Sequence, residues 1–328
     1  MRHLQTLLLS LLLVPTAGAV AAEPPLTPDS VNAADLSAVP AELPAADHSA
    51  KAEAAIVKLE IMLDRAGASP GVIDGFDGDN LRKAVRAFEA MAGLTVDGKV
   101  SSDVIGKLQT GNPVIGSYTI TDKDVADLVP EIPTDYAEMA KLKFLGFTRV
   151  TEELGERFHM DEDLLKALNP QAKFVTGESI AVADPGPDEE GQVAKIEADK
   201  GDRQVRAYDA DGKLLAAYPA TIGSDDNPSP TGTHLVDAIV HMPNYTYNPD
   251  VNFTQGNNTE KLIIPPGPNG PVGSVWIDLT EPTFGIHGTP EPSKIDKTNS
   301  HGCVRLTNWD AEELSKMVAK GVPVEFVD

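Results

Sequence analysis

Residues 284–308 read FGIHGTPEPSKIDKTNSHGCVRLTN and contain the only cysteine of the chain, Cys303. Two histidines, His287 and His301, lie close to it in sequence. Cysteine attacks a carbonyl carbon as the thiolate, and a free thiol with a pKa near ~8.5 is mostly protonated at neutral pH. A histidine within hydrogen-bond reach supplies the missing base. The stretch therefore predicts nucleophilic catalysis by Cys303.

The two histidines differ in their expected positions relative to the thiol. FGIHG reads as a short strand that ends at His287, and Cys303 follows in a glycine-containing turn before a helix. The end of a strand and a turn before a helix can meet across a fold, whereas residues close in sequence often point apart. His287 is therefore the predicted base, and His301 is a secondary candidate. The amides of Gly302 and Cys303 are candidates for an oxyanion hole. Arg305 is a candidate for binding a substrate carboxylate through a bidentate pair.

The sequence around this stretch alternates apolar and polar residues in short runs separated by turns. This pattern predicts a mainly antiparallel β domain over residues 190–328, with one helix over 309–320 before a closing strand. The predicted strands fall within 192–200, 204–210, 214–223, 232–240, 274–279, 284–288 and 322–327. An Asn-rich segment, residues 244–260, is either a substrate-covering loop or a solvated insertion, and the sequence leaves both open.

Residues 51–112 change to helical spacing. Two helices, one ending before Gly67 and one carrying Leu81, Val85 and Phe88, precede a short third helix that begins near Ser101. The turns between them contain Asp-Gly pairs, which suit a positive φ. This order of helices, with IDG and GL..DG turns, resembles a peptidoglycan-binding domain. A generic helical spacer is the alternative.

Residues 117–184 form a less regular unit between these two domains. The predicted order is β-α-α-β, with a helix over 151–158, a second helix that ends at Asn169-Pro170, and a closing strand in GESIAVAD. The order is similar to a degenerate LysM module, a small α+β glycan-binding fold, with residues 131–139 as an insertion. The unit is interpreted either as a glycan-binding module or as a spacer.

The N-terminal residues and the composition set further limits. Residues 1–22 have the basic start, apolar run and small residues of a secretory signal, and the Pro- and Ala-rich residues 23–50 predict a flexible linker. No later run is long enough for a transmembrane helix. With 27 Lys and Arg against 50 Asp and Glu among 328 residues, the net charge is −23. A nucleic-acid partner or an anionic membrane surface is therefore not expected.

The block SHGCVRLTN, preceded by IHGT, resembles the L,D-transpeptidase catalytic domain of the YkuD type. The similarity covers about residues 191–327 and includes PTGTH at 230–234. It implies a β-sandwich with a short C-terminal helix, with Cys303 as nucleophile and His287 as base. It also implies that Ser300 or the Gly288 carbonyl orients the base. The other residues that it assigns to the site are His301 and Gly302 for catalysis, and Arg305, Asn308 and Trp276 for substrate binding.

The resemblance further implies a reaction and its setting. Cys303 would attack the third residue of a peptidoglycan stem tetrapeptide, expel D-Ala, and pass the thioester to an amine. The acceptor could be another stem, which gives a 3→3 cross-link, or a D-amino acid or an outer-membrane lipoprotein. No cofactor or metal is expected. Stem peptides and glycan strands are the expected partners, the periplasm is the expected location, and cell-wall biogenesis and cell shape are the expected roles.

Three alternatives remain from the sequence. A zinc site would use the same residue types, but no HExxH, CxxC or His-x-His motif occurs. A non-catalytic wall-binding scaffold would have lost the activity, which the complete set of site residues argues against. An L,D-carboxypeptidase or amidase would pass the same thioester to water.

Overall fold

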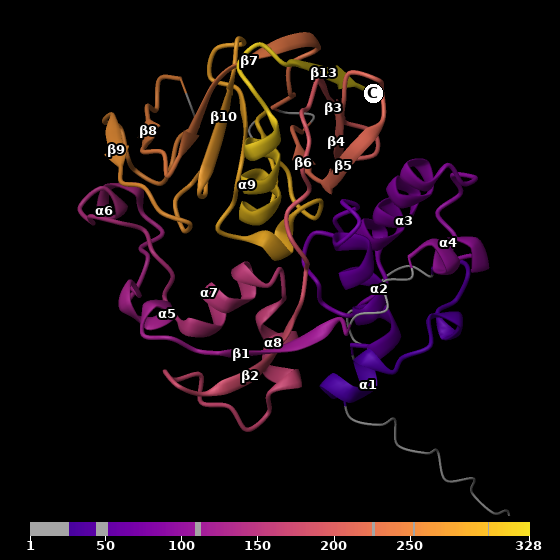
Figure 1. Ribbon diagram of the computed structural model, residues 1–328. Coiled ribbons are helices and arrows are strands. Elements are labelled where there is room, and N and C mark those ends of the chain that lie inside the picture. Colours follow the sequence, from indigo (N-terminus) through magenta and orange to yellow (C-terminus); the bar gives the residue numbers. More distant parts are fainter. Residues whose placement is uncertain (1–25, 44–51, 109–112, 225–226, 252, 301) are drawn as a thin grey trace, which may run out of the picture.

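The computed structural model describes residues 26–43, 52–108, 113–224, 227–251, 253–300 and 302–328 (Figure 1). The predicted secretory signal, residues 1–22, lies outside them. Along the described chain, an N-terminal helical region is followed by a middle unit of short helices and two strands, and then by a β domain with one long C-terminal helix. This multidomain order confirms the fold class predicted from the sequence.

The helical region contains α2 (Ala54–Asp64), α3 (Asp79–Ala92) and α4 (Ser102–Lys107). Ser101 caps α4, because its hydroxyl accepts the Val104 N–H at 3.3 Å. The Asp-Gly turns have the expected geometry, with φ of 81° at Gly75 and 73° at Gly98. A buried carboxylate holds each turn: Glu60 accepts the Gly75 N–H, and Glu89 accepts the Gly98 N–H.

Residues 26–43, which lie within the flexible linker predicted for residues 23–50, are folded in the structure. Within this range, α1 (Pro28–Asn32) and the 3-10 helix η1 (Leu36–Ala38) pack against the helical region. Val31, Leu36, Val39 and Leu43 are buried there. The few apolar residues in this range stand among prolines and alanines without a helical spacing, so the sequence does not predict these helices. Burial of their apolar side chains against the helical region removes apolar surface from water and stabilises them.

The middle unit consists of β1 (Ile115–Thr119), α5 (Lys123–Ala126), α6 (Tyr136–Met139), α7 (Val150–Arg157), α8 (Glu162–Leu168) and β2 (Ser179–Ala183). β1 and β2 pair antiparallel, and Asn169 connects α8 to β2 through hydrogen bonds to the backbone of Leu165 and Ala181. The β-α-α-β order is confirmed, and α5 and α6 are the added elements. The LysM-like identity of the unit stays a prediction.

One hydrophobic core joins the residues of α1, the helical region and the middle unit. Val31, Leu59, Leu81, Leu154 and Ile180 all belong to it and are at most 2% exposed. The two N-terminal units that the sequence separates at residues 112–117 therefore share buried apolar surface. Their relative position is fixed by packing, not by a flexible hinge.

The β domain contains nine strands in one sheet among the described residues, in the order β5-β4-β3-β13-β7-β10-β11-β12-β6. The strands are β3 (Lys195–Asp199), β4 (Gln204–Tyr208), β5 (Leu214–Pro219), β6 (Thr221–Ile222), β7 (Gly232–His241), β10 (Val275–Leu279), β11 (Gly285–His287), β12 (Val304–Arg305) and β13 (Pro323–Val327). The ten-residue β7 pairs with β13 on one side and β10 on the other. β7 therefore joins the two halves of the sheet. The family resemblance predicts this domain as a β-sandwich.

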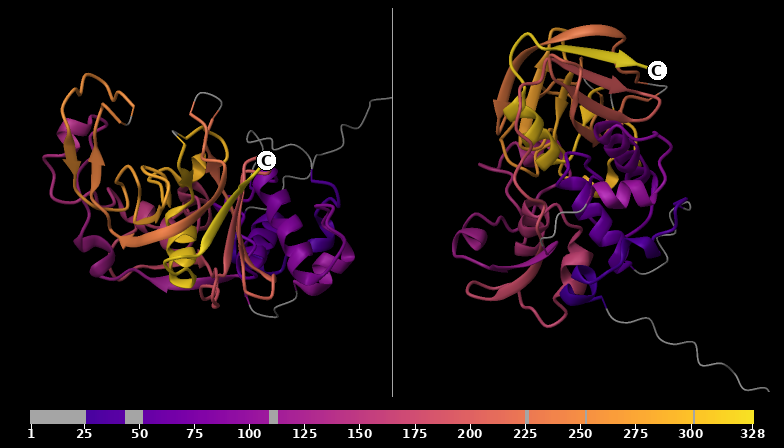
Figure 2. Two further views of the ribbon diagram at one scale, coloured as in Figure 1. Left: turned by 90° about the horizontal axis from the view of Figure 1, so that it is seen from above. Right: turned by 45° about the vertical axis from the view of Figure 1, so that its right-hand side comes forward.

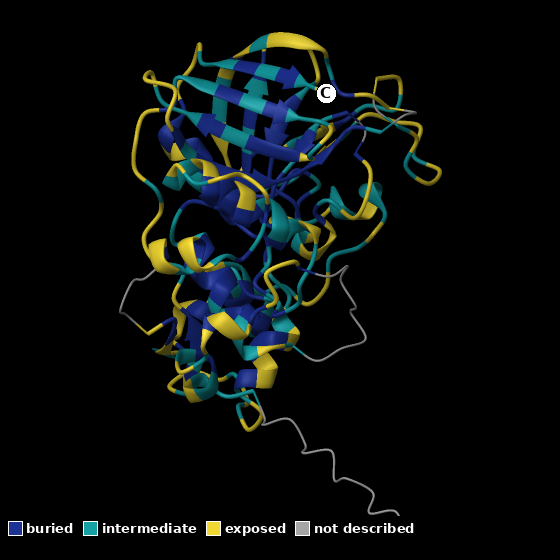
Figure 3. Ribbon diagram, turned by 90° about the vertical axis from the view of Figure 1, so that its right-hand side faces the viewer, coloured by how far each residue is buried: buried dark blue, intermediate teal, exposed yellow. Residues whose placement is uncertain are grey.

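Alternation along the strands separates an apolar face from a polar one. Ile277, Ile286 and Val304 are fully buried and lie in register across β10, β11 and β12. Helix α9 (Asn308–Met317) covers this face and buries Ala311 and Leu314. Residues of both sheet halves and α9 form one core, and Figure 3 shows the alternation of buried and partly exposed positions along the strands. The opposite face carries the chemically active residues.

Strands β8 (Tyr245–Tyr247) and β9 (Leu262–Ile264) form a separate two-stranded sheet. β8 lies in the Asn-rich segment, residues 244–260, and β9 follows directly after it; the views in Figures 1 and 2 place both strands at one end of the β domain beside α6 of the middle unit. The complete burial of Tyr247 argues against the solvated insertion as the interpretation of this segment, and the substrate-covering loop stays a prediction.

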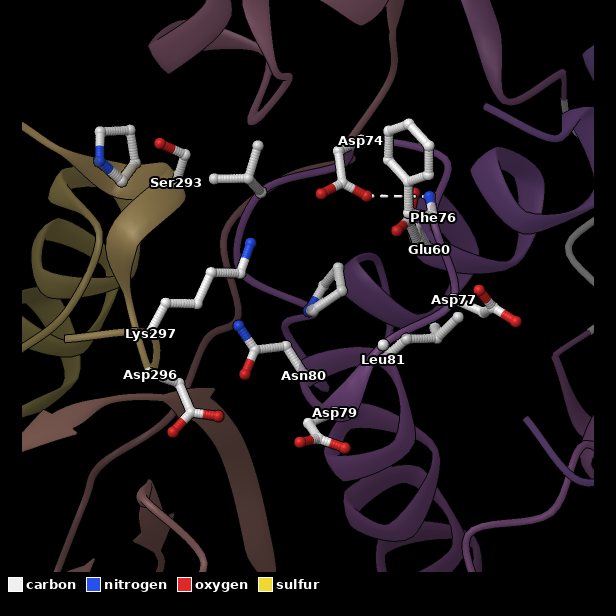
Figure 4. Close-up of a pocket in the computed structure, with 14 residues that line it drawn as sticks. Glu60, Asp74, Phe76, Asp77, Asp79, Asn80, Leu81, Ser293, Asp296 and Lys297 are labelled. Carbon is white, nitrogen blue, oxygen red and sulfur yellow. Dashed lines mark hydrogen bonds between the residues drawn. The ribbon is translucent and has the colours of Figure 1, made fainter. Parts of the chain in front are cut away.

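The helical region also contacts the β domain directly. The loop with the 3-10 helix η2 (Pro292–Lys294) lies beside the turn of the IDG motif, and Lys83 of α3 forms a 2.6 Å salt bridge with Asp296. Figure 4 shows the pocket of about 300 Å³ between them, into which Asp74, Asn80 and Lys297 project. The loop that leads to Cys303 therefore rests on the N-terminal helices.

Candidate active site

The register of three strands places the predicted site residues on the polar face of the sheet. Trp276 on β10 pairs with His287 on β11, which pairs with Arg305 on β12. Residues paired across neighbouring strands project to the same face. The three side chains therefore form one row across the sheet.

Cys303 belongs to the next row on the same face. It precedes Val304 by one residue, just as Gly285 precedes Ile286, the strand partner of Val304. The register thus places Cys303 directly before β12, level with Gly285 and two positions along the neighbouring strand from His287. The fold thus brings the segments that carry the predicted nucleophile and the predicted base, sixteen residues apart in the sequence, onto neighbouring strands.

His287 is buried, and its ring has one defined hydrogen bond. Nδ1 lies 2.7 Å from the Gly288 carbonyl oxygen. Because a carbonyl only accepts, Nδ1 carries the proton and Nε2 is the basic nitrogen. Burial, together with the positive charge of Arg305, lowers the pKa of His287 to about 3. The imidazole is therefore neutral at physiological pH and able to accept a proton.

Cys303 is partly exposed, and its Sγ lies 3.6 Å from the Thr283 carbonyl oxygen. Burial raises the pKa of the thiol, while the Gly285 N–H and the Arg305 charge act in the opposite direction and Asp278 adds to the rise. The resting site is thus a neutral thiol beside a neutral imidazole. Proton transfer to His287 has to accompany attack on a substrate.

Ser300 holds the turn before the nucleophile. Its hydroxyl donates to the Cys303 carbonyl at 2.6 Å and accepts the Gly223 N–H at 2.7 Å and the Gly302 N–H at 3.2 Å. Of the two groups expected to orient His287, Gly288 does so and Ser300 does not. The Gly302 amide, expected in an oxyanion hole, is directed at Ser300 in this conformation. His301 lies outside the described residues.

Gly302 is required by the geometry of this turn. Its φ is +106°, and a Cβ at this position would lie 2.6 Å from the ring of Phe284. Its carbonyl accepts a hydrogen bond from Ser229 at 2.7 Å. The turn is therefore fixed by backbone contacts on both sides of Cys303.

Trp276 and Arg305 flank the imidazole on either side in the same row. The Trp276 ring stacks on His287 with 5.4 Å between centroids, and its Nε1 donates to Asp278 at 2.9 Å. The Trp276 ring also occupies the space over Gly285, where a Cβ would lie 2.6 Å from it. Arg305 donates to the Asn299 carbonyl at 3.4 Å. Trp276 is thus placed to orient the base as well as to contact a substrate.

The structure places Asn308 behind the site and not in it. The side chain is 2% exposed; its oxygen accepts the Ser274 N–H, and its amide group donates to the Pro268 carbonyl and to both carboxylate oxygens of Glu156. These partners use its hydrogen-bonding capacity, so the expected substrate contact is not formed. Asn308 instead fixes the backbone at Gly288, where a Cβ would lie 2.2 Å from Asn308 Oδ1.

Several groups at the site carried no sequence signal. Glu156, from the middle unit, lines a pocket of about 420 Å³ behind Asn308, and burial raises its pKa to about 8. Tyr245 on β8 follows the end of β7, whose Val240 pairs with Trp276, and burial raises the pKa of its phenol, with the charge of Cys303 adding to the rise. Asp278 could have been found by strand alternation, since it lies two residues after Trp276.

The residues that the structure describes contain no group of three or more His, Cys, Asp or Glu side chains arranged to hold a metal ion. Within the same ranges, none of the helices has the length and apolar character needed to cross a bilayer.

Comparisons with known proteins identify two domains. Residues 194–326 match the L,D-transpeptidase catalytic domain, YkuD, and residues 52–108 match a peptidoglycan binding domain. A Bacillus licheniformis protein named L,D-transpeptidase YkuD is 31% identical over 38% of this chain and 59% of its own length. Its Bacillus subtilis namesake is 29% identical over 51% of this chain and 87% of its own length.

The chain thus spans about three fifths of the first of these relatives. Among solved structures, an L,D-transpeptidase from Mycobacterium smegmatis is 20% identical over 48% of this chain and 65% of its own, with a TM-score of 0.35. The resemblance to both families, drawn above from IHGT, SHGCVR and the helical module, is confirmed at the level of the domains.

Proposed function

We propose, on the premise that residues 194–326 belong to the L,D-transpeptidase catalytic domain family, that this protein is an L,D-transpeptidase acting on peptidoglycan. The observation that carries the proposal is the register of β11 and β12, which pairs Ile286 with Val304, the residue after Cys303, and His287 with Arg305, together with the hydrogen bond between His287 Nδ1 and the Gly288 carbonyl. This arrangement leaves Nε2 as the proton acceptor.

The first step forms a thioester. His287 Nε2 takes the Cys303 proton as the sulfur attacks the carbonyl carbon of the third stem residue. A C–S bond forms, the amide C–N bond to the terminal D-Ala breaks, and the imidazolium returns the proton to the leaving amine. Neutral resting forms of both groups suit this sequence, since no ion pair has to be separated before substrate binds.

The second step transfers the acyl group to an amine. The amine attacks the thioester, an amide forms, the C–S bond breaks, and the proton lost by the amine returns to the sulfur through His287. A stem-peptide amine gives a 3→3 cross-link, whereas a D-amino acid, a lipoprotein amine or water gives other products. Arg305, on the row next to Cys303, is the proposed partner of a stem carboxylate.

The N-terminal units support a location at the cell wall. Residues 52–108 match a peptidoglycan binding domain, and a domain that holds the enzyme on its polymer raises the effective concentration of substrate. We place the mature protein in the cell envelope, and in the periplasm if residues 1–22 are removed on export as their sequence predicts.

Product analysis tests this function. Purified protein is incubated with a disaccharide tetrapeptide muropeptide, and the products are separated and weighed by mass spectrometry. The proposal expects D-Ala release together with cross-linked dimers, and no release by Cys303→Ala. D-Ala release with only the tripeptide as second product would show an L,D-carboxypeptidase, and no release at all would favour a wall-binding scaffold.

A further inference from the structure

The strands β8 and β9 cannot hold their position by themselves. They form a two-stranded sheet apart from the nine-stranded one, and a lone pair of strands is marginally stable in water. We use the name flap for these two strands and residues 253–261 between them. What holds the flap has to come from another part of the chain.

That support comes from residues 130–146 of the middle unit, here called the anchor segment. Leu145, Tyr247 and Ile264 are completely buried in a small core of their own. The partly buried residues packed against it come from both sides: Ile132, Tyr136, Met139 and Leu142 from the anchor segment, and Tyr245 and Leu262 from the flap. This core is separate from those of the β domain and of the helical region.

Tyr136 is at the centre of the contact. Its ring packs edge-on against three aromatic rings of residues 245–253, with centroid distances of 5.9 Å to Tyr245, 5.3 Å to Tyr247 and 6.1 Å to Phe253. Edge-to-face pairs of this kind each change an equilibrium by about two- to tenfold beyond their buried area. Helix α6 is short, so these ring contacts set where it meets the flap.

Hydrogen bonds add a defined register. Gln255 accepts the Tyr136 N–H at 3.1 Å and donates to the Thr134 carbonyl at 2.9 Å. Asn258 donates to Gln255 at 2.6 Å and to Asp135 at 3.4 Å. Behind the flap, Leu145 exchanges backbone hydrogen bonds with the chain at Pro266 and Asn269. The anchor segment therefore holds the flap by backbone and side-chain contacts together.

The flap begins close to the end of the strand that borders the reactive row. Val240 of β7 pairs with Trp276, which pairs with His287 in the row that continues to Arg305, and β8 starts five residues after Val240. In keeping with this position, the charges of Cys303 and Arg305 both act on the pKa of Tyr245. Figure 2 shows β8 and β9 rising beside α6 at one end of the β domain, in agreement with Figure 1.

We propose that the anchor segment is part of the active site: Tyr136, from outside the matched catalytic domain, is a positioning residue that holds the flap over Cys303 and so controls binding of the stem peptide. The middle unit then has a role that neither a spacer nor a glycan-binding module would have. This inference rests on the proposed function for its substrate, but not for the contact itself.

The test compares three single variants in the full chain. Tyr136→Ala removes the ring, Tyr136→Phe keeps it, and Tyr118→Ala removes a ring of equal size from β1 of the same unit, where it packs on Phe158 away from the flap. Hydrogen exchange of residues 245–247 and 262–264 reports on the flap. D-Ala release from a tetrapeptide muropeptide gives kcat and KM.

We expect Tyr136→Ala to raise flap exchange and KM by about tenfold, from the loss of three ring pairs, with kcat changed less than about threefold. Tyr136→Phe should restore both values to within about threefold of the wild type, and Tyr118→Ala should leave both unchanged. If Tyr136→Ala does not fold, Gln255→Ala, which removes only hydrogen bonds, should still raise flap exchange at least about threefold.

Flap exchange within about twofold of the wild type in Tyr136→Ala would overturn the inference, as would an equal effect of Tyr118→Ala. A wild-type protein that releases no D-Ala would instead overturn the proposed function, and the exchange measurements would still decide whether the anchor segment holds the flap.

Discussion

Asp310 is a buried carboxyl group whose replacement should have a clear pH signature. It lies in the first turn of α9, is 3% exposed, and is near Asp64 of the helical region and His159 of the middle unit. Burial raises its pKa to about 8, and the negative charge of Asp64 contributes to the rise. The group therefore reports on the junction where the three parts of the chain meet.

The magnitude follows from linkage. The folded pKa is above the unfolded one, so between pH 4 and pH 8 the unfolded chain has released a proton that the folded chain retains. The free energy of unfolding then falls as pH rises, by about 4 kcal/mol from pH 5 to pH 8 for this group. Asp310→Asn has nearly the same shape and cannot ionise. Relative to the wild type it should gain about that amount over the same interval.

Urea unfolding at pH 5 and pH 8, followed by tryptophan fluorescence, measures this difference. Both tryptophans of the chain, Trp276 and Trp309, are in the β domain. Asp211→Asn is the matched control, because it makes the same change at an exposed position, in the turn between β4 and β5. A difference between Asp310→Asn and wild type that changes by less than about 1 kcal/mol between the two pH values would refute the reasoning.

Three further predictions concern the site and its support. Because the pKa of His287 is lowered to about 3, D-Ala release from the tetrapeptide muropeptide should keep its rate down to about pH 4, and an acid limb near pH 6.5 in the pH profile of this rate would contradict this. Gly302→Ala should lose about 2 kcal/mol of stability in urea unfolding and most of its acylation rate, because the Cβ meets the Phe284 ring. Lys83→Met should lower the free energy of unfolding by about 2 kcal/mol in the same assay. This is less than the ~3–5 kcal/mol expected when one partner of a fully buried pair is removed, because Arg203 also forms a salt bridge with Asp296. An unchanged free energy of unfolding would argue against the contact between the helical region and the β domain.

The strands around Cys303 could be predicted because one face of their sheet is buried in the core and the other is not, so that apolar and polar residues alternate along each strand. Ile277, Ile286 and Val304 alternate with Trp276, His287 and Arg305, and this alternation identifies both the core face and the active face. The Asp-Gly turns of the helical region were predictable for a similar local reason. Helix α9 was also predicted, with its end shifted from residue 320 to Met317.

What the sequence could not supply are contacts between distant segments. Nothing in the residues near Tyr136 indicates that they pack against Gln255, and nothing near Glu156 indicates the hydrogen bonds to Asn308. Asn308 was expected at the substrate from the family resemblance, but the first turn of α9 directs it into the interior. The helices at Pro28–Asn32 and Leu36–Ala38 were missed because tertiary packing, and not local propensity, stabilises them.

The central claim is that Cys303 carries the substrate acyl group as a thioester and that His287 takes its proton. A single turnover with the tetrapeptide muropeptide, quenched in acid and analysed by peptide mapping, tests it most directly. The account predicts an adduct equal to the substrate minus D-Ala on the peptide that contains Cys303, absent in Cys303→Ala and formed about 10²–10⁴-fold more slowly by His287→Gln. An adduct at another residue, or wild-type acylation rates in His287→Gln, would contradict it.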